Sequence, residues 1–346
     1  MSPISSTLAN ASARAYRTFA AALPGSTAIA VSHPNTPFVS AYPWSTGFGT
    51  KYANPATLPT GTAYGVGFKR QGDAIAVSHV TTPFISAYPW SAGFGSKYAN
   101  PATLPGGNGY GGVVFKPQGD AIAIGHFNSP FVAAYPWSAG FGTKYANPAT
   151  LPSNLVNNLN FRPQGDVIAL PHVSSPYIST YPWSAGFGTK YADPATLPGA
   201  NGADVAFTPS GDAIAVVVTG APFVAAYPWS AGFGTKYSNP ATAPTGNSYG
   251  VAFTPQGNAI AISHSNTPFV SAYPWSSGFG TKYANPATLP TGTSTGVAFT
   301  NSGDGIAISH YISPRVTAYP WSAGFGTKYA DPATIPTGNG SDVDFL

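Results

Sequence analysis

Short runs of alternating large and small residues recur along almost the whole chain. In the run 74–79, the large side chains of Ile75, Val77 and His79 point to one face, while the small residues between them point to the other. This period of two predicts a β-strand, and its two apolar faces predict burial on both sides. A tight turn rich in Pro, Gly and Asp precedes such runs, and a second strand pattern follows at 84–88.

Each run belongs to a larger unit with four strand signals. A Gly-Val-x-Phe strand, as at 250–253, is followed by the turn, the alternating run and a Phe-Val-Ser-Ala-Tyr strand; the fourth signal begins at Gly-Thr-Lys-Tyr and runs into Asn-Pro-Ala-Thr. One tryptophan marks each unit, and successive tryptophans lie 46 or 47 residues apart. They are Trp44, Trp90, Trp137, Trp183, Trp229, Trp275 and Trp321. A fixed period of this length indicates one supersecondary unit stacked on copies of itself.

Sheets with one face of small residues and one of large residues can nest against one another around an axis. The sequence therefore predicts an all-β, seven-bladed β-propeller over residues 26–346, with four antiparallel strands in each blade. The prolines of the fourth strand suit an outer edge. The last inner strand, 341–346, has no partner after it, so we expect it to pair beside 28–33 in the first blade and close the ring.

The repeat resembles known propeller units. The strand order, the Gly-Val-x-Phe-x-Pro-x-Gly-Asp turn and the period over residues 28–346 are similar to the broad class that includes WD40 and YVTN-type repeats. The unit lacks the Gly-His and Trp-Asp dipeptides of WD40 repeats, so that family's side-chain network does not carry over. The whole unit, with Tyr-Pro-Trp-Ser-x-Gly-Phe-Gly-Thr-Lys-Tyr, also resembles repeats in uncharacterised tailed-phage proteins, which implies a virion component and carries no known active site.

Composition narrows the function classes. Only 7% of residues are charged, the net charge is +4 and no basic run occurs, which argues against nucleic-acid binding. The absence of cysteine excludes disulfides, thiol catalysis and cysteine-ligated zinc. No stretch has the pattern of a secretory signal and none is apolar for about 18 residues, so we expect neither a signal peptide nor a membrane span.

Residues 1–25 differ from the repeat and are expected to form an N-terminal arm or helix. Apolar residues recur at helical spacing between Ser5 and Leu23, which predicts a short amphipathic helix. A β-strand at 18–23 is the alternative, because this segment aligns with the start of later repeats. Four side chains of the arm are candidates for docking to another virion protein: Arg14, Tyr16, Arg17 and Phe19.

Six histidines occupy one repeat position, and Val218 takes the seventh place. Equivalent positions in adjacent blades lie roughly 10 Å apart, too far for a shared metal site with bonds of ~2 Å. We therefore expect a structural hydrogen bond at each histidine and no metal or other cofactor. The turn aspartates lie six residues earlier, across a strand of roughly 20 Å, so no Asp–His relay is expected. The histidines are His33, His79, His126, His172, His264 and His310.

Two repeated side chains are candidates for ligand binding. The tryptophans sit at a strand end, where they act either as packing wedges between blades or as stacking platforms for sugar rings. The lysines of Gly-Phe-Gly-Thr-Lys form a peripheral ring that either solvates the outer edge or binds a repeated ligand. This motif lacks the spacing and the following helix of a phosphate-binding loop. The lysines are Lys51, Lys97, Lys144, Lys190, Lys236, Lys282 and Lys328.

A few residues break the repeat and are candidates for a unique site: the segment 154–160, Asp204, Arg315, Asp342 and Asp344. Asp204 and Asp342 fall on innermost strands, where a side chain can face the channel of a propeller. Catalysis needs an asymmetric constellation, and near-perfect sevenfold repetition works against one. The repeat therefore favours a protein that is not an enzyme.

The sequence thus predicts a non-enzymatic structural or adhesive protein, located in a phage virion. Its expected partners are other virion proteins, through the arm, and a host-surface glycan. The alternative is a multivalent lectin-like propeller with one carbohydrate site in each blade. A second alternative is a hydrolase or lyase with an active site in the channel, built around Asp204 and Asp342.

Overall fold

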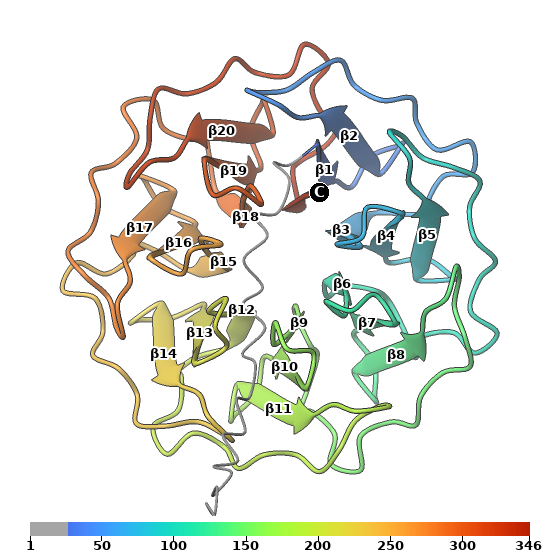
Figure 1. Cartoon of the computed structure of the whole chain (residues 1–346), viewed down its shortest axis with the longest axis horizontal. Coiled ribbons are helices and arrows are strands. Elements are labelled where there is room, and N and C mark those ends of the chain that lie inside the picture. The colour runs from blue at the N-terminus through green and yellow to red at the C-terminus, as the bar shows by residue number, and fades with distance from the viewer. Residues whose placement is uncertain (1–26) are drawn as a thin grey trace, which may run out of the picture.

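The structure is a computed structural model that describes residues 27–346. These residues form seven antiparallel sheets, which are arranged as blades around a central axis (Figure 1). Across the described residues there are strands and no helix, and hence no helix with the length and apolar character needed to cross a membrane. The predicted all-β, seven-bladed propeller is confirmed. The predicted arm at residues 1–25 lies outside the described residues.

Each blade has an inner, a middle and an outer strand. The inner strands are β3 (Ala63–Phe68), β6 (Val113–Phe115), β9 (Asn160–Phe161), β12 (Gly202–Phe207), β15 (Ser248–Phe253), β18 (Ser294–Phe299) and β21 (Asp342–Phe345). The middle strands are β1 (Ala28–Ser32), β4 (Ala74–His79), β7 (Ala121–Gly125), β10 (Val167–Pro171), β13 (Ala213–Val218), β16 (Ala259–His264) and β19 (Gly305–His310). The outer strands are β2 (Val39–Pro43), β5 (Ile85–Pro89), β8 (Val132–Pro136), β11 (Ile178–Pro182), β14 (Val224–Pro228), β17 (Val270–Pro274) and β20 (Val316–Pro320). We number the blades 1 to 7 in the order of their outer strands.

The ring closes through the two ends of the described chain. In blade 1 the last strand, β21, pairs with the first, β1, with Ile29 opposite Phe345 and Val31 opposite Val343. The pairing extends beyond the strand ends, because Thr27 N donates to the carbonyl oxygen of Leu346 at 2.8 Å. The predicted closure is therefore confirmed, and hydrogen bonds as well as packing hold the ring together.

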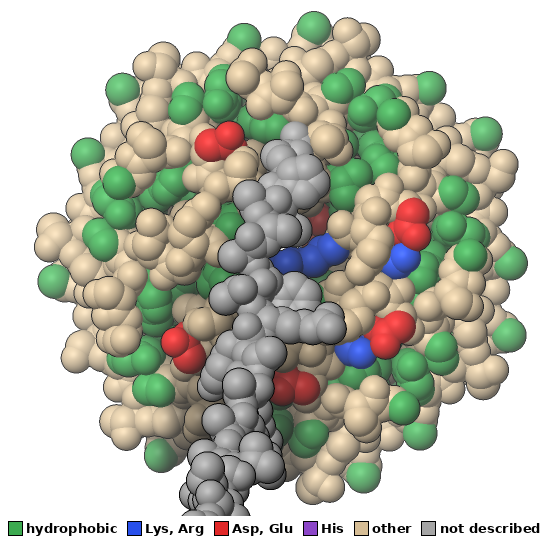
Figure 2. Space-filling view, viewed as in Figure 1, with side chains coloured by type: hydrophobic (Ala, Val, Ile, Leu, Met, Phe, Trp, Pro, Cys, Tyr) green, Lys and Arg blue, Asp and Glu red, His purple; other side chains and the backbone are tan. Residues whose placement is uncertain are grey.

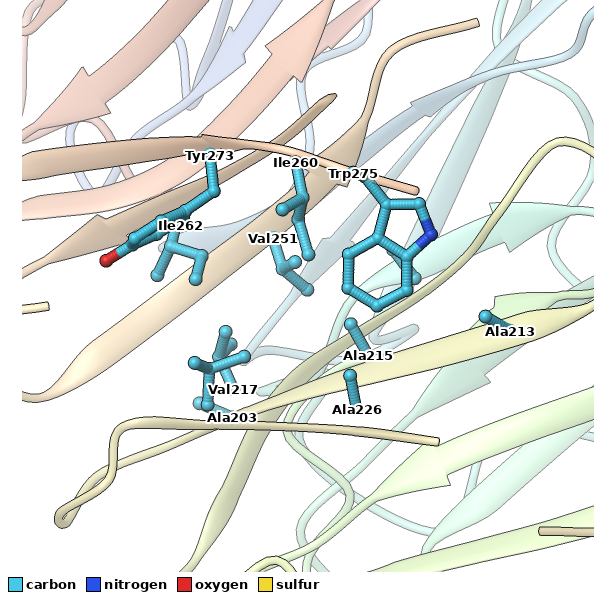
Figure 3. Close-up of a cluster of buried hydrophobic side chains, with 12 residues drawn as sticks. Ala203, Ala213, Ala215, Val217, Ala226, Val251, Ile260, Ile262, Tyr273 and Trp275 are labelled. Atoms are coloured by element: carbon cyan, nitrogen blue, oxygen red, sulfur yellow. The ribbon is translucent and has the colours of Figure 1, made fainter. Parts of the chain in front are cut away.

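The core consists of seven clusters, one at each contact between neighbouring blades. In Figure 3 the small side chains of Ala215 and Ala226 in blade 5 face the large side chains of Ile260, Tyr273 and Trp275 in blade 6. Full burial of one large apolar side chain contributes about 1.5–3 kcal/mol. The alternation of small and large residues in each strand therefore produces the small-against-large contact expected from the sequence.

The innermost strands approach one another closely, and glycine permits this. An added Cβ at Gly65 on β3 would lie 2.8 Å from the Cα of Gly112, which belongs to the next blade. No side chain fits at that distance. The glycine of Gly-Val-x-Phe thus lets the inner strands of blades 2 and 3 come this close beside the axis.

The fourth segment of each unit differs from the prediction. Each sheet has three strands, and the outer segment after them is extended without joining the ladder. Tyr52 N donates to Ala41 O of its own blade at 2.9 Å, and Tyr88 Oη of blade 2 donates to Thr57 O in the outer segment of blade 1 at 2.9 Å. Because Pro55 has no N–H to donate, such a segment makes isolated bonds in place of a regular ladder.

Candidate functional site

The seven tryptophans lie between blades and are nearly buried, with 3–6% of their surface exposed. Trp90 meets Phe94 at a centroid distance of 5.1 Å, Phe68 at 5.0 Å and Tyr52 of the preceding blade at 5.3 Å, each edge to face. This is the arrangement of a packing wedge. A sugar would reach these rings only if the aromatic cluster opened, so the structure offers no stacking platform at the tryptophans.

Each lysine of the peripheral ring donates to an Asn or Asp three residues later in its own turn. The pairs are Lys51–Asn54, Lys97–Asn100, Lys144–Asn147, Lys190–Asp193, Lys236–Asn239, Lys282–Asn285 and Lys328–Asp331. These are nearby turn groups of the kind expected for a solvated outer edge. Binding of a repeated ligand to this ring stays a prediction.

The histidines are buried, and all but His126 make the predicted side-chain hydrogen bonds inside their own blades. In blade 1, Nδ1 of His33 lies 2.8 Å from the carbonyl oxygen of Asn35, and Nε2 lies 3.0 Å from Ser40 Oγ. A carbonyl can only accept, so Nδ1 carries the proton and Nε2 accepts from the hydroxyl. Seven residues after His126, where the other histidines have their partner hydroxyl, the chain has Ala133, so the side-chain hydrogen bond to Nε2 is missing. Burial lowers the pKa of all six to about 4, so they are neutral at pH 7.

The asymmetric part of the molecule lies on the innermost strands. At the first position of Gly-Val-x-Phe, four blades have Gly65, Gly112, Gly250 and Gly296, whereas the other three have Asn158, Asp204 and Asp342. Two residues later in the motif, polar side chains occur in two of those same blades, as Asn160 and Asp344. Amide and carboxyl groups thus replace glycine and small residues at corresponding places beside the axis.

Asp342 and Asp344 connect the first blade to the second. Asp342 Oδ2 accepts from Val66 N at 3.2 Å, and Asp344 Oδ2 accepts from Phe68 N at 2.7 Å. Both acceptors reach the free edge of β3, whose N–H groups have no strand on that side. These bonds fix the orientation of the two half-buried carboxyl groups beside the axis.

Asp204 holds the corresponding place between blades 5 and 6. Its Oδ2 accepts from Val251 N at 2.8 Å, its Oδ1 accepts from Val205 N at 2.7 Å, and Asn158 of blade 4 donates a further hydrogen bond. Asp204 in blade 5 and Asp342 in blade 1 stand almost opposite each other in the ring. The charge of Asp204 nevertheless acts on the Asp342 carboxyl group across the axis.

Burial raises the pKa values of these carboxyl groups. The pKa of Asp204 rises to about 7 through burial, and that of Asp342 rises to about 8 through burial and the charge of Asp204. Burial also raises the pKa of Asp344 to about 6, although the nearby Arg70 charge acts in the opposite direction. Near neutral pH the axis therefore holds a protonated carboxyl group and an ionised one, the pair that general acid–base catalysis uses. Within residues 27–346, no three His or Asp side chains are gathered so as to hold a metal ion.

Sequence reasoning placed Asp204 and Asp342 on inner strands but expected nothing else to converge on them. In the structure Asn158 hydrogen-bonds to Asp204, and the charge of Asp204 acts on Asp342. The signal was present in the repeat, because all three residues occupy one position of the motif. Arg315 lies apart from them, at a turn where its Nη1 donates to Tyr311 O at 2.7 Å. The candidate docking residues Arg14, Tyr16, Arg17 and Phe19 lie outside the described residues.

Comparison with known proteins finds similar structures but no similar sequences. No family model and no curated protein matches the chain. A provisionally assigned 6-phosphogluconolactonase from Bacteroides uniformis is similar with a TM-score of 0.68 and 14% identity, over 92% of this chain and 99% of its own. One from Bacteroides fragilis has a TM-score of 0.70 and 11% identity, over 92% and 97%. The periplasmic gluconolactonase of Pseudomonas aeruginosa has a TM-score of 0.67 and 12% identity, over 92% and 99%.

These comparisons correct the functional prediction from the sequence. The expectation of a non-enzymatic virion component is wrong, because three of the structures that match over nearly their whole length carry the names of lactonases. The premise behind that expectation also fails, since the inner strands are asymmetric although the blades repeat. At 11–14% identity the likeness itself concerns the fold, and in fold the chain is a seven-bladed β-propeller.

Proposed function

We propose that this protein is a hydrolase that opens lactones at the central axis. The observation that carries the proposal is the carboxyl pair of Asp204 and Asp342, whose pKa values are raised to about 7 and about 8. The names of the similar structures, 6-phosphogluconolactonase and gluconolactonase, support a lactone of the sugar-acid type as the substrate.

The reaction requires one base and one acid. Ionised Asp204 takes a proton from water as the water oxygen attacks the lactone carbonyl carbon. Protonated Asp342 gives its proton to the ring oxygen as the ring C–O bond breaks, so the product is a hydroxy acid. The proton on Asp204 then passes to Asp342, directly or by exchange with solvent, which restores the starting state. Asn158 acts as a positioning residue, because its hydrogen bond fixes the Asp204 carboxylate.

The test is lactone hydrolysis followed by proton release, with glucono-δ-lactone and its 6-phosphate as substrates and spontaneous hydrolysis subtracted. Changing a positioned general acid or base costs about 10²–10⁴-fold in rate, so Asp204→Asn and Asp342→Asn should each lower kcat in that range. Asp193→Asn is the matched control, since that carboxylate lies in an outer turn beside Lys190. The proposal fails if the folded wild-type protein accelerates neither lactone, or if both axial variants keep full activity.

A further inference from the structure

In blades 2, 3 and 4, the groove between neighbouring turns holds a basic side chain from the chain itself. Each basic residue follows the phenylalanine of Gly-Val-x-Phe and forms an ion pair with the turn aspartate four residues later. The pairs are Lys69–Asp73 at 2.7 Å, Lys116–Asp120 at 3.0 Å and Arg162–Asp166 at 2.9 Å. The basic side chains are only 10–17% exposed. The groove therefore buries the alkyl part of the basic side chain, and the cationic end of that side chain forms an ion pair with the turn aspartate.

The far wall of the groove is the turn of the next blade. An added Cβ at Gly119 would lie 2.5 Å from Cε of Lys69, and one at Gly165 would lie 2.8 Å from Cε of Lys116. The stem thus rests directly against the glycine of the following turn. These contacts define which volume the basic side chain fills.

In blade 5 no side chain of residues 27–346 fills the same volume. Thr208 replaces the basic residue, and an added Cβ at Gly257 of the next turn would meet only Pro209. A cavity of about 260 Å³ lies there, lined by Thr208, Asp212, Tyr237, Gln256 and Trp275 among others. The aromatic pair Tyr237–Trp275, with centroids 5.5 Å apart, forms an apolar wall of the kind that an alkyl stem packs against.

The carboxylate of Asp212 remains in place although its own blade supplies no cation to it; within the described part of the chain, only the charge of Arg162 in blade 4, whose Nε donates to Gly211 O, acts on it from the neighbouring turn. One of its oxygens, Oδ1, accepts from Ser210 Oγ at 2.6 Å and Thr208 Oγ1 at 2.7 Å. These hydrogen bonds lower the pKa of Asp212, so the group is ionised at neutral pH. Among residues 27–346, no basic side chain forms an ion pair with it. Figure 2 shows the resulting contrast, since some carboxylates on this face lie beside a basic side chain and others lie alone.

We propose that the groove between blades 5 and 6 is a binding site for an alkylammonium or alkylguanidinium group, with Asp212 as its counter-ion. The ligand takes the place that Lys69, Lys116 and Arg162 take in the other blades. The cation comes either from a small amine or from a lysine or arginine side chain of a partner polypeptide. The site is separate from the axial carboxyl groups and does not depend on the proposed lactonase activity.

The first test measures binding of n-butylamine to the whole protein by saturation-transfer NMR and calorimetry, with n-butanol as the uncharged probe. Butylamine should bind and butanol should not. Asp212→Asn should weaken butylamine binding about tenfold or more, the cost of losing one charge-assisted hydrogen bond. Asp120→Asn is the matched control and should leave binding unchanged, because Lys116 fills that groove. Equal binding of the two probes, or full binding by Asp212→Asn, overturns the proposal.

Two exchanges between blades make the test sharper. Thr208→Lys should supply an internal cation and abolish binding, whereas Lys116→Thr should empty the groove of blade 3 and add a second equivalent site. Both residue types already occur at this turn position in the fold, so each variant should fold. Binding that survives Thr208→Lys, or that is lost only in Asp304→Asn, contradicts the assignment to blade 5. A lysine peptide that binds about tenfold tighter than butylamine identifies a polypeptide as the source of the cation; equal affinity identifies a small amine.

Discussion

Two sets of buried titratable groups should give this protein a stability maximum near pH 7. The six histidines have pKa values of about 4 in the folded protein against an ordinary value of 6.5, so acid protonates them first in the unfolded chain. Their contribution to stability is complete above pH 6.5 and is lost as the pH falls towards 4. The three axial carboxyl groups have raised pKa values, so the folded state holds protons that the unfolded state releases.

The magnitude follows from counting protons. Between about pH 4 and 6, the unfolded state binds six extra protons on histidine and the folded state three on carboxyl groups, a difference of three. The free energy of unfolding should then fall by up to about 4 kcal/mol for each pH unit of acidification. Above about pH 7 the histidines are largely neutral in both states and the carboxyl groups Asp204 and Asp342 dominate the difference, so stability should fall again as the pH rises towards 8, by up to about 1–3 kcal/mol per unit.

Denaturant unfolding followed by tryptophan fluorescence, at closely spaced values between pH 4.5 and 8.5, measures both limbs. Asp342→Asn should flatten the alkaline limb, whereas Asp193→Asn in an outer turn should leave it unchanged. His126→Val, which copies Val218 of blade 5, should reduce the acid slope by about one proton, or about 1.4 kcal/mol per pH unit. A free energy of unfolding that rises steadily from pH 6.5 to 8 would refute the assignment of raised pKa values at the axis.

Three further changes test the packing of the ring. Phe345→Ala should lower the free energy of unfolding by about 3–5 kcal/mol. It should also expose the β1 amides to hydrogen exchange, whereas Phe115→Ala in blade 3 should not, because only Phe345 belongs to the closing strand. Equal exchange in the two variants would contradict this. Tyr88→Phe removes one hydrogen bond and should lower the free energy of unfolding by about 1 kcal/mol in denaturant titrations. Lys97→Ala removes only the exposed contact with Asn100 and should change the same free energy by less than about 0.5 kcal/mol, so a larger loss would show a structural role for the lysine ring.

The fold could be predicted from the sequence because its signals are repeated and local. Period-two alternation in runs such as 74–79 indicates strands, and the spacing of the tryptophans gives the number of blades. The unpaired last strand, with Val343 and Phe345, indicates how the ring closes. The fourth segment was predicted less well, because its apolar residues suggest a strand while its prolines remove the donors that a ladder needs.

The axial site could not be predicted in the same way, since the distance between blades is not encoded locally. Asn158, Asp204 and Asp342 lie 46 and 138 residues apart in the chain, and they come to one axis only because the seven blades close into a ring. The raised pKa values of Asp204 and Asp342 depend on burial at the centre of the ring, and the local sequence around each residue does not indicate that burial. The sequence does contain the residues, but their convergence is a property of the closed ring.

Comparison of equivalent positions within one chain explains both candidate sites. When several copies of a repeat carry the same kind of residue, that residue serves packing, and a departure in other copies must either be neutral or do something that the first copies do not. At the axis, carboxyl and amide side chains replace glycine, so the departure adds polar groups. Between blades 5 and 6, threonine replaces a basic residue, so the departure removes a cation and leaves a carboxylate beside a cavity. The first kind of change supplies side chains that can react. The second leaves a cavity, and the basic side chains that fill this place in blades 2, 3 and 4 indicate which kind of ligand fits it. Asymmetry in a repeat protein is therefore informative even where the repeat itself describes only the scaffold.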